Sequence, residues 1–343
     1  MPRLNPNQFL DGDDEYTPDR RTHRLLKRKP DRKPKRHPAD VEREMSAQSD
    51  GRSDFNFTYH ASRYERPWIV SSLGDFYENR WIDDVLRLLK GGKEASVYQC
   101  LADPSIGAGR YLAAKVYRPR MFRNLKNDHL YREGRADLDA DGNVILDGGM
   151  QHAMYKRTGY GKDLLHASWI EHEYQALQQL DAAGVDVPTP YACDNNAILM
   201  EYIGDTITPA PTLNGIELEP EEAPRLFERV LHNVSVMLEH GRIHGDLSAY
   251  NILYWEGEIW LIDFPQAINP DENRNAYRIF ERDIIRICEY FAHQGVVRAP
   301  RRIAAELWEA NGRKLKPDVH PRLLDDRDEA DLAYWRGQQE ADG

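Results

Sequence analysis

The stretch HGDLSAYNILYWEGEIWLIDF, residues 244–264, decides the fold. It predicts two short apolar strands joined by a Glu-Gly turn, with Asp246 and Asn251 before the first strand and Asp263 after the second. A carboxylate beside buried strands is costly unless another group compensates its charge. The stretch therefore has two interpretations: a purely structural hydrogen-bond network, or a magnesium site.

The spacing HGD-x4-N, then a strand pair, then Ile-Asp resembles the catalytic core of the protein-kinase-like fold, which implies phosphoryl transfer. The reaction needs a carboxylate that orients the attacking oxygen, oxygen ligands for magnesium, and a lysine on the nucleotide phosphates. We expect Asp246 to be the catalytic carboxylate, Asn251 to reach the metal from the same loop, and Asp263 to be the main metal ligand. In the alternative interpretation these side chains only cap a turn.

The first half of the chain contains a candidate for the lysine. Lys115 lies in the apolar run YLAAKVY, which predicts a strand, so its ammonium needs a partner. Glu173, on the amphipathic stretch WIEHEYQALQQLDAAG, is the expected partner, and Glu171 on the same run is the competitor. The alternative is an ion pair between a surface helix and a strand edge.

Charge is distributed unevenly along the chain. The 343 residues suggest two lobes or domains, and the net charge is -11. Residues 20–36, RRTHRLLKRKPDRKPKR, nevertheless contain a single acid, so an acidic body carries a basic arm. This argues against nucleic-acid binding by the whole surface and leaves the arm as an RNA or ribosomal contact, or as a solvated tail.

Cysteine usage and hydropathy bear on the compartment. Cys100, Cys193 and Cys288 are scattered, which favours a reducing compartment and supports neither a disulfide framework nor a zinc site. The opening residues MPRLNPNQFLDGDDE show no secretory signal, and no apolar run is long enough to span a bilayer. We expect a cytoplasmic protein with no membrane partner, and the oligomeric state stays open.

The order of elements, strands with one helix and then a helical half, predicts an α+β fold in two unequal lobes. Residues 75–90, DFYENRWIDDVLRLLK, predict one broad apolar helical face, ended by Gly91 and Gly92. The expected regions are a disordered basic and polar arm (1–66), a helical segment (67–90), an N-lobe (91–203) with a flexible insertion (118–168), a C-lobe (204–297) and a charged, partly helical tail (298–343).

The insertion contains RADLDADGNVILDG, in which acidic residues alternate before a glycine. An EF-hand-like calcium loop is one interpretation, but position twelve of that loop would be Gly148 instead of a bidentate glutamate. An Asp-Gly-Asn turn between two short strands explains the same letters, so we expect a β-hairpin.

Six segments occur in an order that resembles the RIO family of atypical kinases and ATPases, most closely its first subfamily. They are GGKEASVY, AAKVY, EYQALQQLDAAGVDVPTPY, ILMEYIG, HGDLSAYNILY and IDFPQAI, and the similarity runs over residues 89–294. The resemblance implies a bilobal protein-kinase-like fold with ATP between a small β-rich N-lobe and a mostly helical C-lobe. It also implies Mg²⁺, or Mn²⁺ in its place, as the metal.

The same resemblance implies roles for further residues. Met200 would border the adenine, and the backbone of Glu201 and Ile203 would hydrogen-bond it. Asp283 would support the catalytic loop by accepting backbone N–H bonds. An abbreviated phosphate-covering loop, which is not a Walker A loop, would contain Gly91, Gly92, Lys93, Glu94, Ser96 and Val97.

The segment between Asp263 and Asp283 is too short for an activation segment, and Asp263-Phe264-Pro265 replaces the DFG triplet of ordinary kinases. The resemblance therefore implies ATP hydrolysis or autophosphorylation, including an aspartyl-phosphate on Asp263, with Ser/Thr protein substrates less secure. It also implies a link to maturation of the small ribosomal subunit. The alternatives are a small-molecule kinase of the aminoglycoside or choline type and a non-catalytic nucleotide-binding assembly factor.

Overall fold

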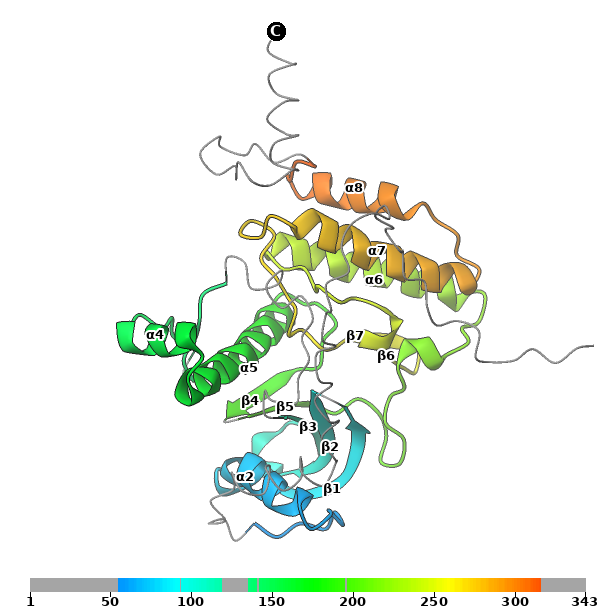
Figure 1. Ribbon diagram of the computed structural model, residues 1–343. Helices are drawn as coiled ribbons and strands as arrows, with labels where there is room; N and C mark the ends of the chain where they lie inside the picture. Colours follow the sequence, from blue (N-terminus) through cyan, green and yellow to red (C-terminus); the bar gives the residue numbers. More distant parts are fainter. Residues whose placement is uncertain (1–54, 93, 119–134, 141, 195, 316–343) are drawn as a thin grey trace, which may run out of the picture. The chain divides into compact units, whose positions relative to one another are not determined.

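The structure is a computed structural model that describes residues 55–92, 94–118, 135–140, 142–194 and 196–315 (Figure 1). All of these residues fall in one compact unit, Pro38–Gly343. The basic arm, residues 20–36, and the end of the tail, residues 316–343, lie outside the described residues. Within the described residues, no helix is both long and apolar enough to cross a membrane.

The first half of the unit is built on a five-stranded antiparallel sheet, in the order β1-β2-β3-β5-β4 (Figure 1). Its strands are β1 (Ile82–Gly91), β2 (Ala95–Ala102), β3 (Tyr111–Tyr117), β4 (Pro190–Asp194) and β5 (Ala197–Glu201). The expected strands around YLAAKVY and AILMEYIG are confirmed as β3 and β5.

Strand β3 divides its side chains between two hydrophobic clusters. Alternate residues from Leu112 to Val116 pack in the cluster that contains helix α2 (Glu65–Glu78). Ala113 and Tyr117 belong to the other cluster, which extends into the helical half. Because successive side chains of a strand point to opposite faces, Lys115 shares the face of Ala113 and Tyr117. This parity directs its ammonium toward the helical half.

The expected helix over residues 75–90 is wrong in its second part. Helix α2 ends at Glu78, Arg80 adopts a left-handed φ of 57°, and the chain then forms strand β1. Register shifts interrupt the pairing of β1 with β2 at three places. Such bulges break the two-residue alternation of a strand, so buried residues such as Ile82 and Val85 are three apart, as they would be on a helix.

The expected disorder of residues 1–66 is wrong for its last part, residues 55–66. Phe55 and Phe57 are buried in the cluster that contains α2, and Phe55 stacks on Tyr77. The Tyr59 N–H donates to the carbonyl of Val85 over 2.9 Å. This segment therefore packs against the outer face of the sheet before α2 begins.

The helical half follows the sequence pattern closely. Its main helices are α6 (Glu222–Glu239), α7 (Ala276–His293) and α8 (Pro300–Ala310), and α6 and α7 run side by side (Figure 1). The predicted hairpin is confirmed as β6 (Ile252–Trp255) and β7 (Glu258–Leu261). The prediction of an α+β fold is therefore confirmed.

The turn of that hairpin explains the Glu-Gly pair in the opening stretch. Glu256 and Gly257 both have positive φ, 49° and 85°, as a two-residue type I′ turn requires. Helix α7 begins at Ala276, soon after Asp263, which agrees with the expected lack of an activation segment.

The insertion is more ordered than expected where the structure describes it. A bridge pairs Leu138 with Val144, and the Asp139 N–H donates to the Asn143 carbonyl over 2.9 Å, which confirms the predicted β-hairpin. Helix α4 (Gly148–Lys156) follows, and α5 (Gly159–Ala182) begins well before the expected helix start near residue 169. The described part of the insertion after residue 134 therefore has regular structure, and its flexibility stays a prediction.

Candidate functional site

The loop that precedes β6 is held by helix α7. Asp283, a buried residue of α7, accepts the Gly245 N–H over 2.9 Å, as expected for a support of this loop. Arg282 donates to the Gly245 carbonyl and, over 3.1 Å, to Asp283 itself. Burial raises the pKa of Asp283 to about 6, although Arg282 and backbone N–H groups favour its charged form.

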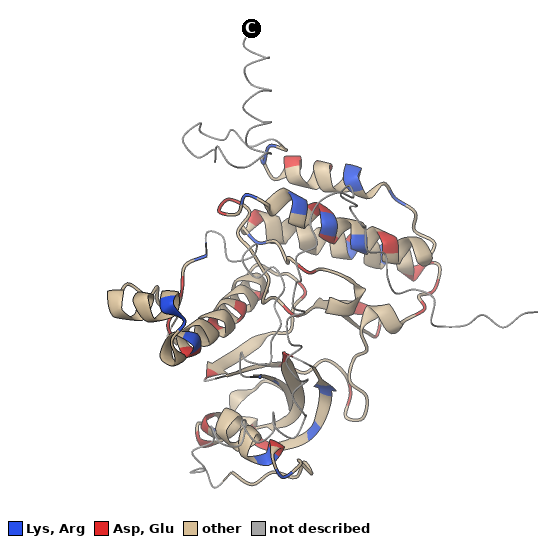
Figure 2. Ribbon diagram, in the orientation of Figure 1, with Lys and Arg blue, Asp and Glu red and all other residues tan. Residues whose placement is uncertain are grey.

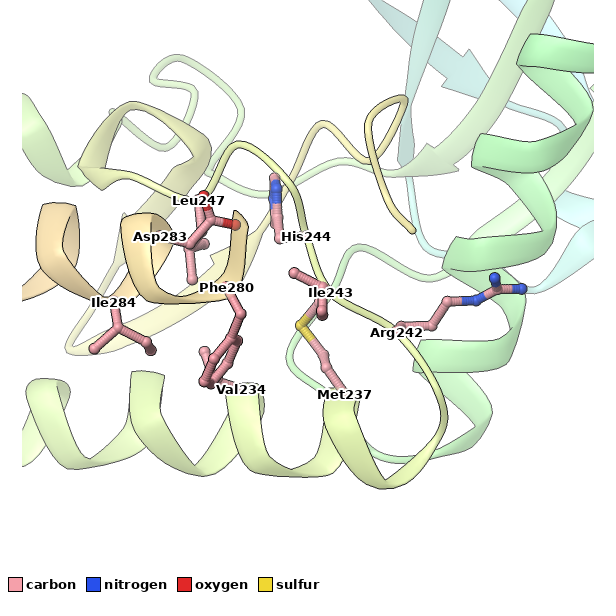
Figure 3. A pocket seen from close by; sticks show the side chains of 9 residues that line it. All are labelled: Val234, Met237, Arg242, Ile243, His244, Leu247, Phe280, Asp283 and Ile284. Carbon is pink, nitrogen blue, oxygen red and sulfur yellow. The ribbon is translucent and has the colours of Figure 1, made fainter. Parts of the chain in front are cut away.

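A small pocket lies beneath this loop (Figure 3). Phe280 and Asp283 of α7 meet Val234 and Met237 of α6 there, and His244 of the loop forms another part of the lining. Neither Lys115 nor Asp263 lines this pocket. The pocket therefore belongs to the support of the loop, and the predicted chemical groups lie elsewhere.

Two loops run in close contact at the site. Ile243 and Ile268 exchange two backbone hydrogen bonds of 3.0 Å. Gly245 has a φ of 81°, and a Cβ atom there would lie 2.2 Å from the Gln266 carbonyl oxygen. Only glycine fits this position, because the conformation and the contact both exclude a side chain.

His244 joins the loop to the segment directly after β7, which carries Asp263. Its Nδ1 accepts the Asp246 N–H over 3.3 Å, so its Nε2 carries the proton and donates to the Ile262 carbonyl over 3.1 Å. Burial lowers the pKa of His244 overall, although the neighbouring carboxylates of Asp263 and Asp246 oppose the shift. His244 is therefore a neutral scaffold residue that keeps the two loops in register.

Asp246 and Asn251 occupy one loop, as predicted. Asn251 is buried and donates through Nδ2 to the Asp246 carbonyl over 2.9 Å. Its Oδ1 accepts no hydrogen bond within the described part of the chain, so this oxygen remains free for a metal. Asp246 is half exposed, and its Oδ1 accepts from Arg286 Nη1 over 2.7 Å.

Lys115 is held between two carboxylates. Its Nζ lies 2.5 Å from Glu173 Oε1 and 2.6 Å from Asp263 Oδ1. The Lys115 and Glu173 side chains are 11% and 1% exposed, whereas that of Asp263 is 43% exposed. The expected pairing with Glu173 is thus present, while Glu171 instead accepts from Gln175 over 3.0 Å.

The same pairings govern protonation. Burial alone would lower the pKa of Lys115, but the carboxylates of Asp263 and Glu173 raise it overall. Burial alone would raise the pKa of Asp263, but the Lys115 ammonium holds it below its ordinary value. Lys115 and Asp263 are therefore both charged at neutral pH.

Asp263 also has an unusual backbone. Its φ is 73°, in the left-handed region that non-glycine residues seldom adopt. Such a conformation persists only where the surroundings impose it, and it often marks a functional site. Here it accompanies a carboxylate whose Oδ1 contacts Lys115 and whose Oδ2 makes no hydrogen bond to the described residues.

The residues expected around an adenine are placed at the end of β5. Met200 and Ile203 are buried. The Glu201 N–H already donates to the Thr189 carbonyl over 2.8 Å, and the Ile203 carbonyl accepts from Ala210 over 2.9 Å. No described residue accepts the Ile203 N–H. This N–H could therefore donate a hydrogen bond to an adenine.

The expected phosphate-covering loop is the tight turn between β1 and β2. Gly91 pairs with Ser96, and the Gly92 N–H donates to the Ala95 carbonyl over 2.9 Å. Val97 pairs with Lys115 across the sheet, which places the end of this turn beside the lysine. The Glu94 carbonyl accepts the Arg118 N–H, and Lys93 lies outside the described residues.

A divalent metal would find two protein oxygens here. Over the described residues, no group of three or more His, Cys, Asp or Glu side chains is arranged to hold a metal. Asn251 Oδ1 and Asp263 Oδ2 are both without hydrogen-bond partners in that part of the chain. This set fits Mg²⁺, which is usually bound by one or two carboxylates together with substrate phosphates.

Comparison with known proteins places this geometry in a family. The model of the RIO domain matches residues 146–303, which include Glu173, Asp246, Asn251, Asp263 and Asp283. The chain is 31% identical over 135 residues to the RIO-type serine/threonine-protein kinase Rio1 of Thermoplasma acidophilum, covering 39% of this chain and 69% of that protein. The chain belongs to the RIO family.

Other relatives match a larger share of this RIO protein. Rio1 of Haloferax volcanii is 30% identical over 208 residues, or 60% of this chain, and rio1 of Schizosaccharomyces pombe is 27% identical over 215 residues, or 62% of it. The chain spans 62% and 39% of the lengths of these two proteins. The solved Rio2 kinase–ADP/Mg²⁺–phosphoaspartate complex of Chaetomium thermophilum aligns with a TM-score of 0.44 and 20% identity, over 79% of this chain and 75% of that one.

Two site residues of this RIO protein escaped the sequence analysis. The Tyr117 hydroxyl donates to Glu173 Oε2 over 2.6 Å, and Arg286 contacts Asp246. The position of each residue in the sequence could have indicated its role. Tyr117 lies two positions after Lys115 and so shares its strand face, and Arg286 lies three positions after Asp283 and so shares its helix face.

Proposed function

We propose that this chain catalyses magnesium-dependent phosphoryl transfer from ATP, as a RIO-type atypical kinase or ATPase. The observation that carries the proposal is the position of Lys115 between Glu173 and Asp263. An ammonium that is buried, charged and fixed by two carboxylates is suited to bind phosphate oxygens. The loop with Asp246 and Asn251 is joined through His244 to the backbone beside Asp263.

Nucleotide binding would use groups at the end of β5 and in the loops on either side of Lys115. The Ile203 N–H and the Glu201 carbonyl would hold the adenine against Met200, and the turn at residues 91–97 would cover the phosphates. Asn251 Oδ1 and Asp263 Oδ2 would hold Mg²⁺, or Mn²⁺ in its place. The bound metal would neutralise negative charge on the phosphates.

Asp246 would orient the attacking oxygen and accept its proton. With water as the acceptor, the γ-phosphoryl group leaves ADP and forms inorganic phosphate. With the ionised Asp263 carboxylate as the acceptor, the nucleophile has no proton to lose; an aspartyl-phosphate forms and ADP leaves, and Asp246 would accept a proton from the water that then hydrolyses the acyl phosphate. A serine or threonine hydroxyl of a protein is the remaining acceptor, and the short link from Asp263 to α7 offers little platform for such a peptide.

Two other functions compete with this proposal. A small-molecule kinase uses the same chemistry, and a non-catalytic assembly factor would bind ATP without consuming it. Contact with the ribosome or RNA through the basic arm, and a role in maturation of the small ribosomal subunit, are proposals from the family resemblance. A cytoplasmic location is a proposal that the free Cys100, Cys193 and Cys288 support.

ATP turnover with Mg²⁺ tests the proposal. We expect turnover by the intact chain, and its loss in Asp246→Ala and Asp263→Asn but not in Asp83→Asn, which changes an exposed aspartate of β1. Hydroxylamine-sensitive label on the intact chain would identify the acyl phosphate, and acid-stable label would identify serine or threonine. Tight ATP binding without turnover would favour the assembly factor. Turnover that requires an added amino alcohol or aminoglycoside would favour the small-molecule kinase.

A further inference from the structure

The two oxygens of the Asp246 carboxylate have different surroundings. Oδ1 accepts a charge-assisted hydrogen bond from Arg286 Nη1 over 2.7 Å. Among the described residues, Oδ2 has only a long contact of 3.5 Å, with Asn251 Nδ2. Because Arg286 occupies Oδ1, Oδ2 is the oxygen that can receive a hydrogen bond from an incoming water or hydroxyl.

Arg286 reaches this carboxylate from the helix that also holds the loop backbone. Asp283, one turn earlier on α7, accepts the Gly245 N–H, and residues three apart lie on the same helix face. Helix α7 thus restrains both the backbone and the side chain next to the predicted reaction centre. The helix carries charges of both signs, so Arg286 is not part of a uniformly basic surface (Figure 2).

We propose that Arg286 is a positioning residue for phosphoryl transfer, which fixes the Asp246 carboxylate with Oδ2 toward the acceptor. This inference rests on the proposed function and adds a residue to the same site. Arg286 contacts neither Lys115 nor Asp263 in the described structure, so it acts on the acceptor side and leaves nucleotide binding unchanged. A misplacement of about 1 Å at a reacting group can lower turnover by about 100-fold.

A merely structural ion pair is the competing explanation. The Arg286 and Asp246 side chains are 38% and 43% exposed, and such exposed pairs contribute little to stability. With a structural role, loss of Arg286 would change unfolding slightly and would affect kcat and ATP affinity alike or not at all. With the positioning role, loss of Arg286 lowers kcat and leaves ATP affinity unchanged.

The experiment compares the intact chain with the variants Arg286→Gln and Arg286→Lys. Arg278→Gln is the matched control, because Arg278 is an exposed arginine on the same helix. Saturating turnover of Mg-ATP gives kcat, and titration with a fluorescent ATP analogue gives Kd. We expect Arg286→Gln to lower kcat by about tenfold or more while Kd changes by less than about twofold. Arg286→Lys should restore part of the loss, and Arg278→Gln should match the intact chain.

Each outcome decides the inference. Equal kcat in Arg286→Gln and Arg278→Gln would overturn it while leaving the proposed function intact. A parallel loss of ATP affinity and kcat would also overturn it, because the residue would then support the whole site. No turnover by the intact chain would instead overturn the proposed function. The positioning role would fall with it, because Arg286 would act only through that reaction.

Discussion

Lys115 neutralises only part of the negative charge around it. It is shared by Glu173 and Asp263, so the three groups carry one positive and two negative formal charges. ATP adds further negative charge through its phosphates. A divalent cation at Asp263 and Asn251 would offset this excess, which is the physical reason that we link nucleotide binding to Mg²⁺.

Replacing Lys115 by methionine removes the ammonium and keeps the volume of the side chain. Glu173, 1% exposed, would then keep the Tyr117 hydroxyl as its one hydrogen-bond partner among the described residues. We expect the free energy of unfolding to fall by about 3–5 kcal/mol, the typical effect of breaking a buried ion pair. Urea unfolding measures this change, with Lys162→Met, which alters an exposed lysine of α5, as the control. An unchanged midpoint would show that the pair is not formed in solution.

Tyr117→Phe removes one hydroxyl from the same network. The hydroxyl is buried and donates to Glu173 over 2.6 Å, and burial raises its pKa well above the ordinary value. A bond to a charged group contributes about 1.5–3 kcal/mol, so we expect a loss of that size on urea unfolding. Tyr111→Phe, on the same strand face but outside this network, is the control. Equal midpoints for the two variants would contradict the prediction.

His244 makes the stability depend on pH. Burial lowers its pKa in the folded chain, whereas the unfolded chain titrates near 6.5. The unfolded state therefore binds the extra proton first, so the contribution of His244 is present above about pH 6.5 and is lost as the pH falls below it. We expect the stability difference between the intact chain and His244→Gln to shrink from pH 7 to pH 5. A difference that grows over this range would mean that His244 is charged in the fold.

Helices α4 and α5 pack closely at a single glycine. A Cβ atom on Gly161 would lie 1.9 Å from the Ala153 carbonyl oxygen, whereas one on Gly159 would meet nothing within 4 Å. The two glycines lie in the same first turn of α5, so they form a matched pair. Helix α4 therefore depends on this contact for its position against α5.

We expect Gly161→Ala to destabilise the α4 region by about 1–3 kcal/mol through overpacking. Gly159→Ala should be neutral or stabilising by up to about 1 kcal/mol, because alanine favours a helix. Hydrogen exchange of the α4 amides measures the local opening. Equal protection in the two variants would show that α4 does not pack on Gly161.

At the scale of the whole molecule, contacts between distant elements join the sheet to the helical half. The turn after α5 places Asp186 where its carbonyl accepts the Leu261 N–H over 2.7 Å and its carboxylate pairs with Arg229 over 2.6 Å. The Lys115–Asp263 pair makes a second connection. A ligand held by both halves stabilises the folded chain by mass action.

Saturating Mg-ATP should therefore raise the melting temperature. At a concentration of about 100 times Kd, the gain is about 2.7 kcal/mol, which corresponds to about 5 °C or more for a chain of this size. We expect EDTA to abolish the increase and Lys115→Met to lack it. An unchanged melting temperature in saturating Mg-ATP would contradict the proposed function.

Short-range patterns account for most of the secondary structure. The hairpin β6–β7, strand β3 and helices α6 and α7 follow from residues that are neighbours in the chain. Strand β1 does not, because its bulges give apolar residues the spacing of a helix. Residues 55–66 likewise pack only because the sheet and α2 offer them an apolar surface.

The sequence by itself determined that the candidate residues Asp246, Asn251 and Asp263 lie around one hairpin. Only the tertiary structure decided which cations compensate the two aspartates. Lys115 reaches Asp263 from 148 positions away in the chain, and Arg286 reaches Asp246 from 40 positions away. Local periodicity shows which face of an element is buried, whereas an ion pair depends on how two distant faces meet in space.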